Sequence, residues 1–149
     1  MKRIIIPVLI LFSVLLFSCA EMAIENTISD FEGSVNIENI SDIKETLSTE
    51  SEMYLGDTEF QAFLDYFDIH RNVDYSSLDI SIDGRDADVY SDGTYQSGTY
   101  PTKVLFWMRR EEAIFAFISQ DWRVYRYYDD DNFIVDLDEV WKKINTQSE

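Results

Sequence analysis

Residues 102–128 read TKVLFWMRREEAIFAFISQDWRVYRYY, and this stretch decides the fold class. Residues 102–109, 112–119 and 122–128 are short segments rich in apolar and aromatic residues, and the pairs Arg110-Glu111 and Gln120-Asp121 separate the three segments. Short apolar and aromatic segments of this length, bounded by turn sequences, are typical of β-strands joined by tight turns. The stretch therefore predicts three antiparallel strands in a meander.

The preceding segment predicts a further hairpin. Residues 78–82 alternate between apolar and polar, Asp83-Gly84 is a turn sequence, and residues 87–95 alternate again. Gly93, Gly98 and Pro101 then punctuate the connection to the longer strands.

Helical periodicity lies on either side of the predicted sheet. A first helix is predicted from residue 40, ending at Leu55-Gly56, and a second begins at the capping sequence Thr58–Gln61. A closing helix follows Asp136. Their apolar stripes are Ile40, Ile43, Leu47 and Tyr54; Phe60, Phe63, Leu64 and Phe67; and Leu137, Val140, Trp141 and Ile144. Helices followed by an antiparallel sheet predict an α+β fold, with N-terminal helices packed on a curved sheet and a short C-terminal helix.

The N-terminus has the features of an export signal. Lys2 and Arg3 precede an apolar run over residues 4–16, which is too short to span a hydrocarbon core of about 30 Å comfortably but is typical of a signal peptide. The run ends in Leu16-Phe17-Ser18-Cys19, which resembles a bacterial lipobox, and Cys19 is the only cysteine. This resemblance implies a signal peptide over 1–18 and lipid on Cys19. The alternatives are an ordinary secretory peptide, or a membrane anchor with an incidental thiol.

The predicted organisation follows from this signal. Residues 19–36 are interpreted as a lipidated tether and 37–149 as a single domain, with a short edge strand near residues 24–31 as the alternative. The expected location is the bacterial cell envelope, anchored through lipid and facing the periplasm or the cell surface.

Composition excludes several classes of protein. The formal charge of −17 repels phosphate backbones, so nucleic acid is not expected as a partner. One cysteine and one histidine exclude a zinc finger or an internal disulfide framework. A chain that is 46% hydrophobic and 15% aromatic is not expected to be disordered.

Both faces of the predicted sheet are apolar. With two-residue turns, Val104, Phe106, Met108, Trp122 and Val124 share one face, and Leu105, Trp107, Tyr125 and Tyr127 share the other; a slip of one residue would exchange them. The face with Trp and Tyr is typical of an interface or a pocket wall. The alternative is that the closing helix covers it.

Basic residues concentrate in this region, as Lys103, Arg109, Arg110, Arg123 and Arg126. They predict either an anionic-ligand site or ion pairs with neighbouring carboxylates, with Arg109 opposite Glu112.

The order of elements over residues 37–128, with Asp121-Trp122-Arg123-Val124-Tyr125 opening the last strand, resembles the cystatin-like cone of the nuclear transport factor 2-like superfamily. The resemblance implies a cone-shaped fold that serves enzymes, ligand-binding domains and dimerisation modules. Fold alone therefore assigns no activity.

Candidate catalytic and metal residues are few. His70, with Asp68 or Asp74, could act as a general acid or base, as cyclase-like relatives imply, or could cap a helix C-terminus. Asp83, Asp86 and Asp88, or residues 129–131, could hold a hard cation loosely, but residues 133–135 break the calcium-loop pattern after the second set, and no cofactor is expected.

The sequence thus leaves three functions open. The first is a non-enzymatic lipoprotein that uses the face of Trp107, Tyr125 and Tyr127 for an envelope protein or for its own copy. The second is a small-ligand binder with a pocket lined by Phe63, Phe67, Phe106 and Trp122. The third is a cyclase-like enzyme using His70.

Overall fold

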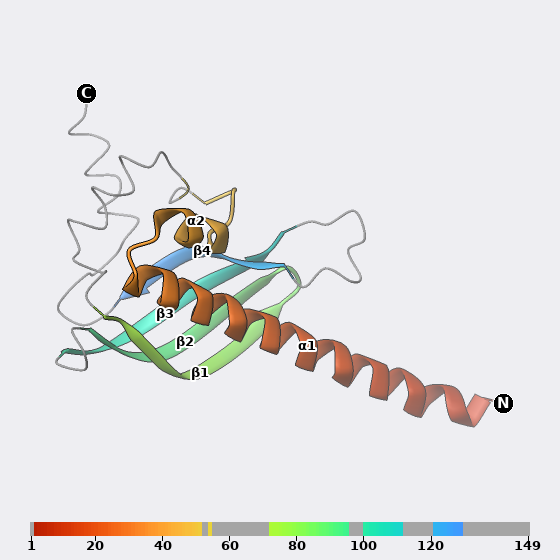
Figure 1. Cartoon of the computed structure of the whole chain (residues 1–149). Coiled ribbons are helices and arrows are strands. Elements are labelled where there is room, and N and C mark those ends of the chain that lie inside the picture. The colour runs from red at the N-terminus through yellow and green to blue at the C-terminus, as the bar shows by residue number, and fades with distance from the viewer. Residues whose placement is uncertain (1, 52–53, 55–71, 96–99, 112–120, 130–149) are drawn as a thin grey trace.

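The computed structural model describes residues 2–51, 54, 72–95, 100–111 and 121–129. In these parts, the C-terminal part of helix α1 (Lys2–Asn36) and helix α2 (Ile40–Thr46) cover one face of a four-stranded antiparallel sheet, and the N-terminal part of α1 extends beyond the sheet (Figure 1). The sheet has the order β1-β2-β3-β4, and its strands are β1 (Asp74–Asp83), β2 (Asp86–Tyr95), β3 (Tyr100–Arg110) and β4 (Trp122–Asp129). The predicted α+β class is confirmed.

Helix α1 supplies much of the core. Five of its residues recur at helical spacing and are nearly inaccessible: Ala20, Ile24, Ile28, Phe31 and Val35. Such a stripe is the packing face of an amphipathic helix. The prediction of a flexible tether over 19–36 is therefore wrong, and so is the alternative of an edge strand, because these residues form a helix that closes over the sheet.

The end of α1 is fixed to the edge of the sheet. Glu38 adopts a φ of 57°, and the amide of Asn39 donates to the carbonyl of Ser34 at 3.0 Å, which closes the helix in a Schellman arrangement. The side chain of Asn36 then donates to the carbonyl of Val73 at 2.8 Å and accepts from its amide at 2.6 Å. One side chain thus satisfies both backbone groups that lead into β1.

Helix α2 is shorter than predicted. It ends at Thr46, and Leu47 is extended and forms a parallel bridge with Val124. The predicted helix through Tyr54 is wrong because tertiary pairing with β4 overrides the helical pattern. The predicted helix over 58–67 and the closing helix lie outside the described residues.

The hairpin of β1 and β2 is confirmed with a shift of one residue. The turn consists of Gly84 and Arg85, because Asp83 pairs with Asp86, and Gly84 has the positive φ of 66° that glycine adopts without strain. β3 pairs directly with β4. The predicted meander with residues 112–119 between these strands is therefore wrong; that segment itself is outside the described part of the chain.

Candidate functional site

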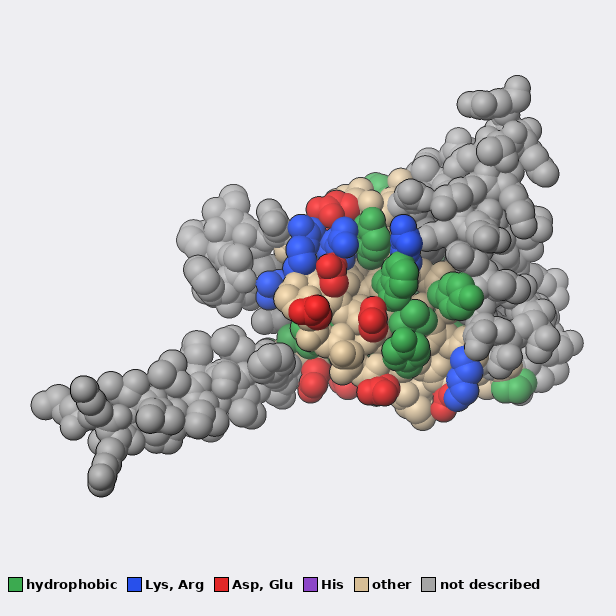
Figure 2. Space-filling view, turned by 180° about the vertical axis from the view of Figure 1, so that it is seen from behind, with side chains coloured by type: hydrophobic (Ala, Val, Ile, Leu, Met, Phe, Trp, Pro, Cys, Tyr) green, Lys and Arg blue, Asp and Glu red, His purple; other side chains and the backbone are tan. Residues whose placement is uncertain are grey.

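The face of the sheet that points away from the helices carries exposed aromatic side chains. Tyr90, Leu105 and Tyr128 lie side by side on β2, β3 and β4, and Trp107 follows Leu105 on the same face. Tyr90 is 56% exposed, Trp107 40% and Tyr128 39%, which is unusual for such large side chains. We call Tyr90, Leu105, Trp107, Tyr125 and Tyr128 the outer aromatic patch; Figure 2 shows hydrophobic side chains gathered across the middle of this face.

The structure sorts the predicted binding residues into two groups. Trp107 and Tyr125 belong to the outer aromatic patch, as predicted. Phe106, Trp122 and Tyr127 are at most 1% exposed and lie in the core. For Phe106 and Trp122 this agrees with the predicted inner face, whereas the outward position predicted for Tyr127 is wrong.

A β-bulge explains the position of Tyr127. The register of β3 and β4 shifts between Trp107, which pairs with Arg126, and Met108, which pairs with Val124. Tyr125 is therefore an extra residue in β4, and strict alternation fails beyond it. The Tyr127 ring turns inward, and its hydroxyl lies 3.0 Å from that of Tyr75.

The space beside Phe106 is filled by aromatic rings. Its ring centroid lies 6.0 Å from that of Phe31, 4.9 Å from Tyr75 and 5.2 Å from Tyr127, all edge-on. The ligand pocket was expected here between helices and sheet. Phe31 occupies that position because residues 20–36 are a helix rather than a tether. Phe63 and Phe67 are outside the described residues.

Guanidinium groups hold the rings of the outer aromatic patch. The guanidinium carbon of Arg109 lies 4.0 Å from the centroid of Tyr125, and that of Arg126 lies 5.1 Å from Trp107. Cation–π contacts of this kind contribute about 0.5–1 kcal/mol each at exposed sites. A hollow of about 340 Å³ opens between them, lined by Asp86, Ala87, Asp88, Trp107, Met108, Arg109, Tyr125 and Arg126.

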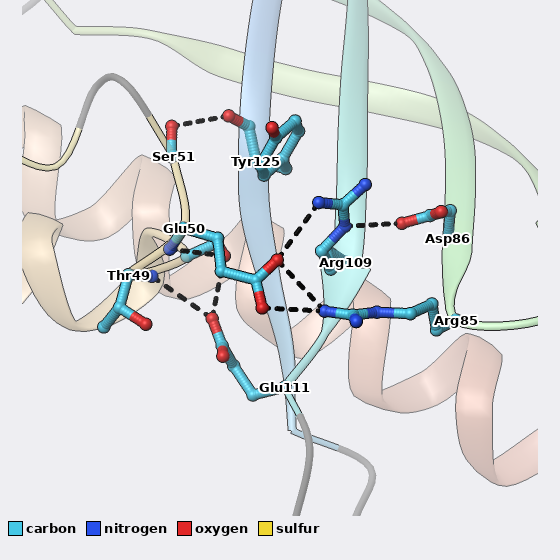
Figure 3. A network of polar contacts seen from close by, with 9 residues as sticks. Thr49, Glu50, Ser51, Arg85, Asp86, Arg109, Glu111 and Tyr125 are labelled. Carbon is cyan, nitrogen blue, oxygen red and sulfur yellow. Dashed lines mark hydrogen bonds and ion pairs between the residues drawn. The ribbon is translucent and has the colours of Figure 1, made fainter.

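A polar network lies at the margin of the patch (Figure 3). Glu50 accepts from Arg85 at 3.0 Å and from Arg109 at 3.2 Å, and Arg109 also donates to Asp86 at 2.7 Å. Hydrogen bonding from Arg85, followed by that from Arg109, holds the pKa of Glu50 below its ordinary value of 4.5 despite some desolvation. The carboxylate therefore stays charged at neutral pH.

The predicted pairing of basic residues with carboxylates is confirmed for Lys103, Arg109 and Arg123, whereas the guanidinium groups of Arg110 and Arg126 lie over aromatic rings. Arg109 contacts Asp86 and Glu50, Arg123 contacts Asp121 at 2.6 Å, and Lys103 contacts Asp92. Glu112, the partner expected for Arg109, is outside the described residues. Because these cations contact anions of their own chain, they do not form an open anion-binding site.

Both edges of the sheet are protected. The segment after α2 runs along β4. The amide of Ser48 donates to the backbone carbonyl of Val124 at 2.8 Å, and the hydroxyl of Ser51 donates to the backbone carbonyl of Tyr125 at 2.6 Å. On the opposite edge, β1 carries the exposed residues Asp79, Ser81 and Asp83. Covered or charged edges disfavour the addition of a further strand to this sheet.

The remaining candidate residues do not assemble into a site among the described residues. His70 and Asp68 lie outside them, and Asp74 is exposed at the start of β1. In the described part of the chain, no group of three acidic, histidine or cysteine residues could hold a metal ion. Asp83, Asp86 and Asp88 therefore do not form such a group. Residues 130 and 131 of the second predicted set lie outside the described residues.

The helical side of the molecule has two further features. An open groove of about 530 Å³ runs between α1, α2 and the start of β4, and its lining includes the carboxylates of Asp30, Asp42, Glu45 and Asp121. Among the residues whose side chains are described, no helix is long and apolar enough to cross a membrane.

Comparison of the chain with protein-family models, curated proteins and solved structures gives no match.

Two residues of the outer aromatic patch, Tyr90 and Tyr128, were not among the residues predicted from the sequence. Tyr90 follows the buried Val89 and lies between Asp88 and Asp92 on the outer face. The alternation of residues 87–95 was therefore the signal that could have assigned Tyr90 to this face. Tyr128 could be assigned to this face only once the bulge at Tyr125 was known.

Proposed function

We propose that this chain is a lipid-anchored protein of the bacterial cell envelope that acts by binding protein through its outer aromatic patch. The observation that carries the proposal is the exposure of Tyr90, Trp107 and Tyr128 on one sheet face. Aromatic side chains backed by arginine are enriched in protein interfaces, where they supply most of the binding energy.

The anchor is the second part of the proposal. Cys19 is exposed, whereas Ala20 is 8% and Ile24 0% exposed, so the core begins one residue after the thiol. Lipid on Cys19 would therefore hold the folded body directly against the bilayer, facing the periplasm or the cell surface. Two or more acyl chains give stable anchoring, because each buried methylene contributes about 0.8 kcal/mol.

The anchor is tested by metabolic labelling with a fatty acid. The full chain is expected to take up the label and to fractionate with membranes. Cys19→Ser is expected to remove the label, because serine offers no thiol for acylation. Equal labelling of both chains would contradict lipidation at this residue.

The binding surface is tested by photo-crosslinking in cells. A crosslinking amino acid replaces Tyr90 in the outer aromatic patch or, as a matched control, Tyr54, which is 42% exposed outside the patch. A discrete crosslinked protein is expected from position 90 and not from position 54. Absence of a discrete product from position 90, or the same product from both positions, would contradict the proposal.

A further inference from the structure

We infer that the partner of the outer aromatic patch is a second copy of this chain, an inference that rests on the proposed function. The two sheets would stack face to face about a two-fold axis that runs along the strands between β2 and β3. This arrangement lays β3 and β4 of one copy over β2 and β1 of the other. Charge on this face carries the inference: Lys103, Arg109 and Arg123 each contact a carboxylate of their own chain, and their remaining N–H donors would contact a carboxylate of the second copy.

The outer face is divided into an acidic and a basic half. On β1 and β2, the charged residues at outward positions are all acidic, whereas on β3 and β4 the described outward charges are all basic. The acidic set is Asp74, Asp79, Asp83, Asp86, Asp88 and Asp92, and the basic set is Lys103, Arg109, Arg123 and Arg126. Figure 2 shows most Lys and Arg side chains in the upper part of the face and most Asp and Glu side chains below them, with acidic side chains also at the upper edge.

This division selects a symmetry. A two-fold axis along the strands exchanges the two halves, so Arg123, Arg109 and Lys103 of one copy lie level with Asp83, Asp86 and Asp92 of the other, whereas Arg126 lies level with Ser81. An in-plane axis across the strands would instead place β4 over β4 and β1 over β1, with like charges in contact. Like charges facing each other across an interface are strongly unfavourable, so the face is complementary to itself in one orientation.

The register of the sheet gives the facing residues. Asp83, Asp86, Arg109 and Arg123 lie at one level across the four strands, so Arg123 of one copy faces Asp83 of the other. Four residues further along the strands, Tyr90 and Leu105 lie at the centre of the sheet. Tyr90 of one copy would face Leu105 of the other across the axis. The contact therefore has apolar residues at its centre and ion pairs at its margin, which is the usual arrangement of an interface.

The same symmetry argues against a partner of different chemistry. A partner with one sign of charge would match half of this face and repel the other half. A second copy matches both halves, and an isologous interface requires this self-complementarity. Stacked sheets lie about 10 Å apart, which arginine and aspartate side chains can span between them.

The size of the face indicates a weak dimer. Four strands about 4.8 Å apart and about eight residues long give a face of roughly 500 Å², or about 1,000 Å² buried by two copies. This value is at the lower end of specific interfaces. Anchoring in one bilayer would raise the effective concentration of the two copies and favour their association.

The test is a charge exchange between two copies of the full chain that carry different tags and are produced in the same cells. The crosslinking amino acid at position 90 reports a covalent product between the copies. Arg123→Asp alone and Asp83→Arg alone are each expected to lower its yield by roughly tenfold or more, since both place like charges in contact twice. One copy with Arg123→Asp and the other with Asp83→Arg should restore the yield.

A restored crosslinking yield in the exchanged pair also shows that both single variants fold. The double variant Arg123→Asp/Asp83→Arg should associate with a second copy of itself, because its two exchanged charges again face each other. Unchanged yields in the single variants, or no restoration in the pair, would overturn the inference. A product from position 90 with a different protein alone would overturn the second copy as partner and leave the proposed function standing. No product from position 90 would overturn both.

Discussion

Phe31→Ala is expected to lower the free energy of unfolding by about 3–5 kcal/mol, as loss of a large aromatic side chain from a packed core does. Phe31 is 3% exposed, and its ring contacts Tyr75, Phe106 and Tyr127 from α1. Removing the ring leaves a cavity between the helix and the sheet that rigid strands cannot close. Urea unfolding of the full chain in mild detergent measures the change.

The matched control for this variant is Met22→Ala. Met22 lies on the same helix but is 55% exposed, so its truncation is expected to change stability by less than about 0.5 kcal/mol. Equal stability of the two variants would contradict the structural role of α1 and would restore the interpretation of residues 19–36 as a tether.

Trp122→Ala and Trp107→Ala are expected to separate folding from binding. Trp122 is 1% exposed, so its loss is expected to cost about 3–5 kcal/mol of stability. Trp107 is 40% exposed on the outer aromatic patch, so its loss is expected to leave the unfolding midpoint nearly unchanged while weakening association. Thermal unfolding followed by circular dichroism measures the stability of both variants.

The comparison of the two tryptophans assigns each face of the sheet. A large loss of stability in Trp107→Ala, with little loss in Trp122→Ala, would reverse the two faces and remove the surface on which the proposed function depends.

The faces of the sheet could largely be predicted from alternation. Val104, Phe106 and Met108 are buried and Trp107 is exposed, as the period of two requires. Tyr127 could not be assigned, because the extra residue at Tyr125 lies within a strand and leaves no glycine or proline as a signal. Local sequence does not encode such a bulge when the packing of neighbouring strands determines it.

The role of α1 was encoded in the sequence but hidden by its polar residues. Ala20, Ile24, Ile28, Phe31 and Val35 follow one another by four, four, three and four residues, which is a helical repeat. The polar and acidic residues between them resemble a linker in composition. Periodicity, rather than composition, was the signal that distinguished a core helix from a tether.

The limits of helices and the pairing of strands depended on distant residues. The stripe of Ile40, Ile43 and Leu47 predicted one long helix, but Leu47 pairs with Val124, which lies far along the sequence. Likewise, β3 and β4 pair with each other although three neighbouring strands were expected from spacing alone. Tertiary pairing decided between local patterns of similar strength.

The most direct test of the outer aromatic patch as a binding surface is the crosslinking yield from position 90 in Trp107→Ala cells. The account predicts a yield several-fold below that of the unsubstituted chain at equal protein level, because Trp107 is a central aromatic residue of the patch. An undiminished yield would contradict it, since the product would then form without the side chain on which the surface depends.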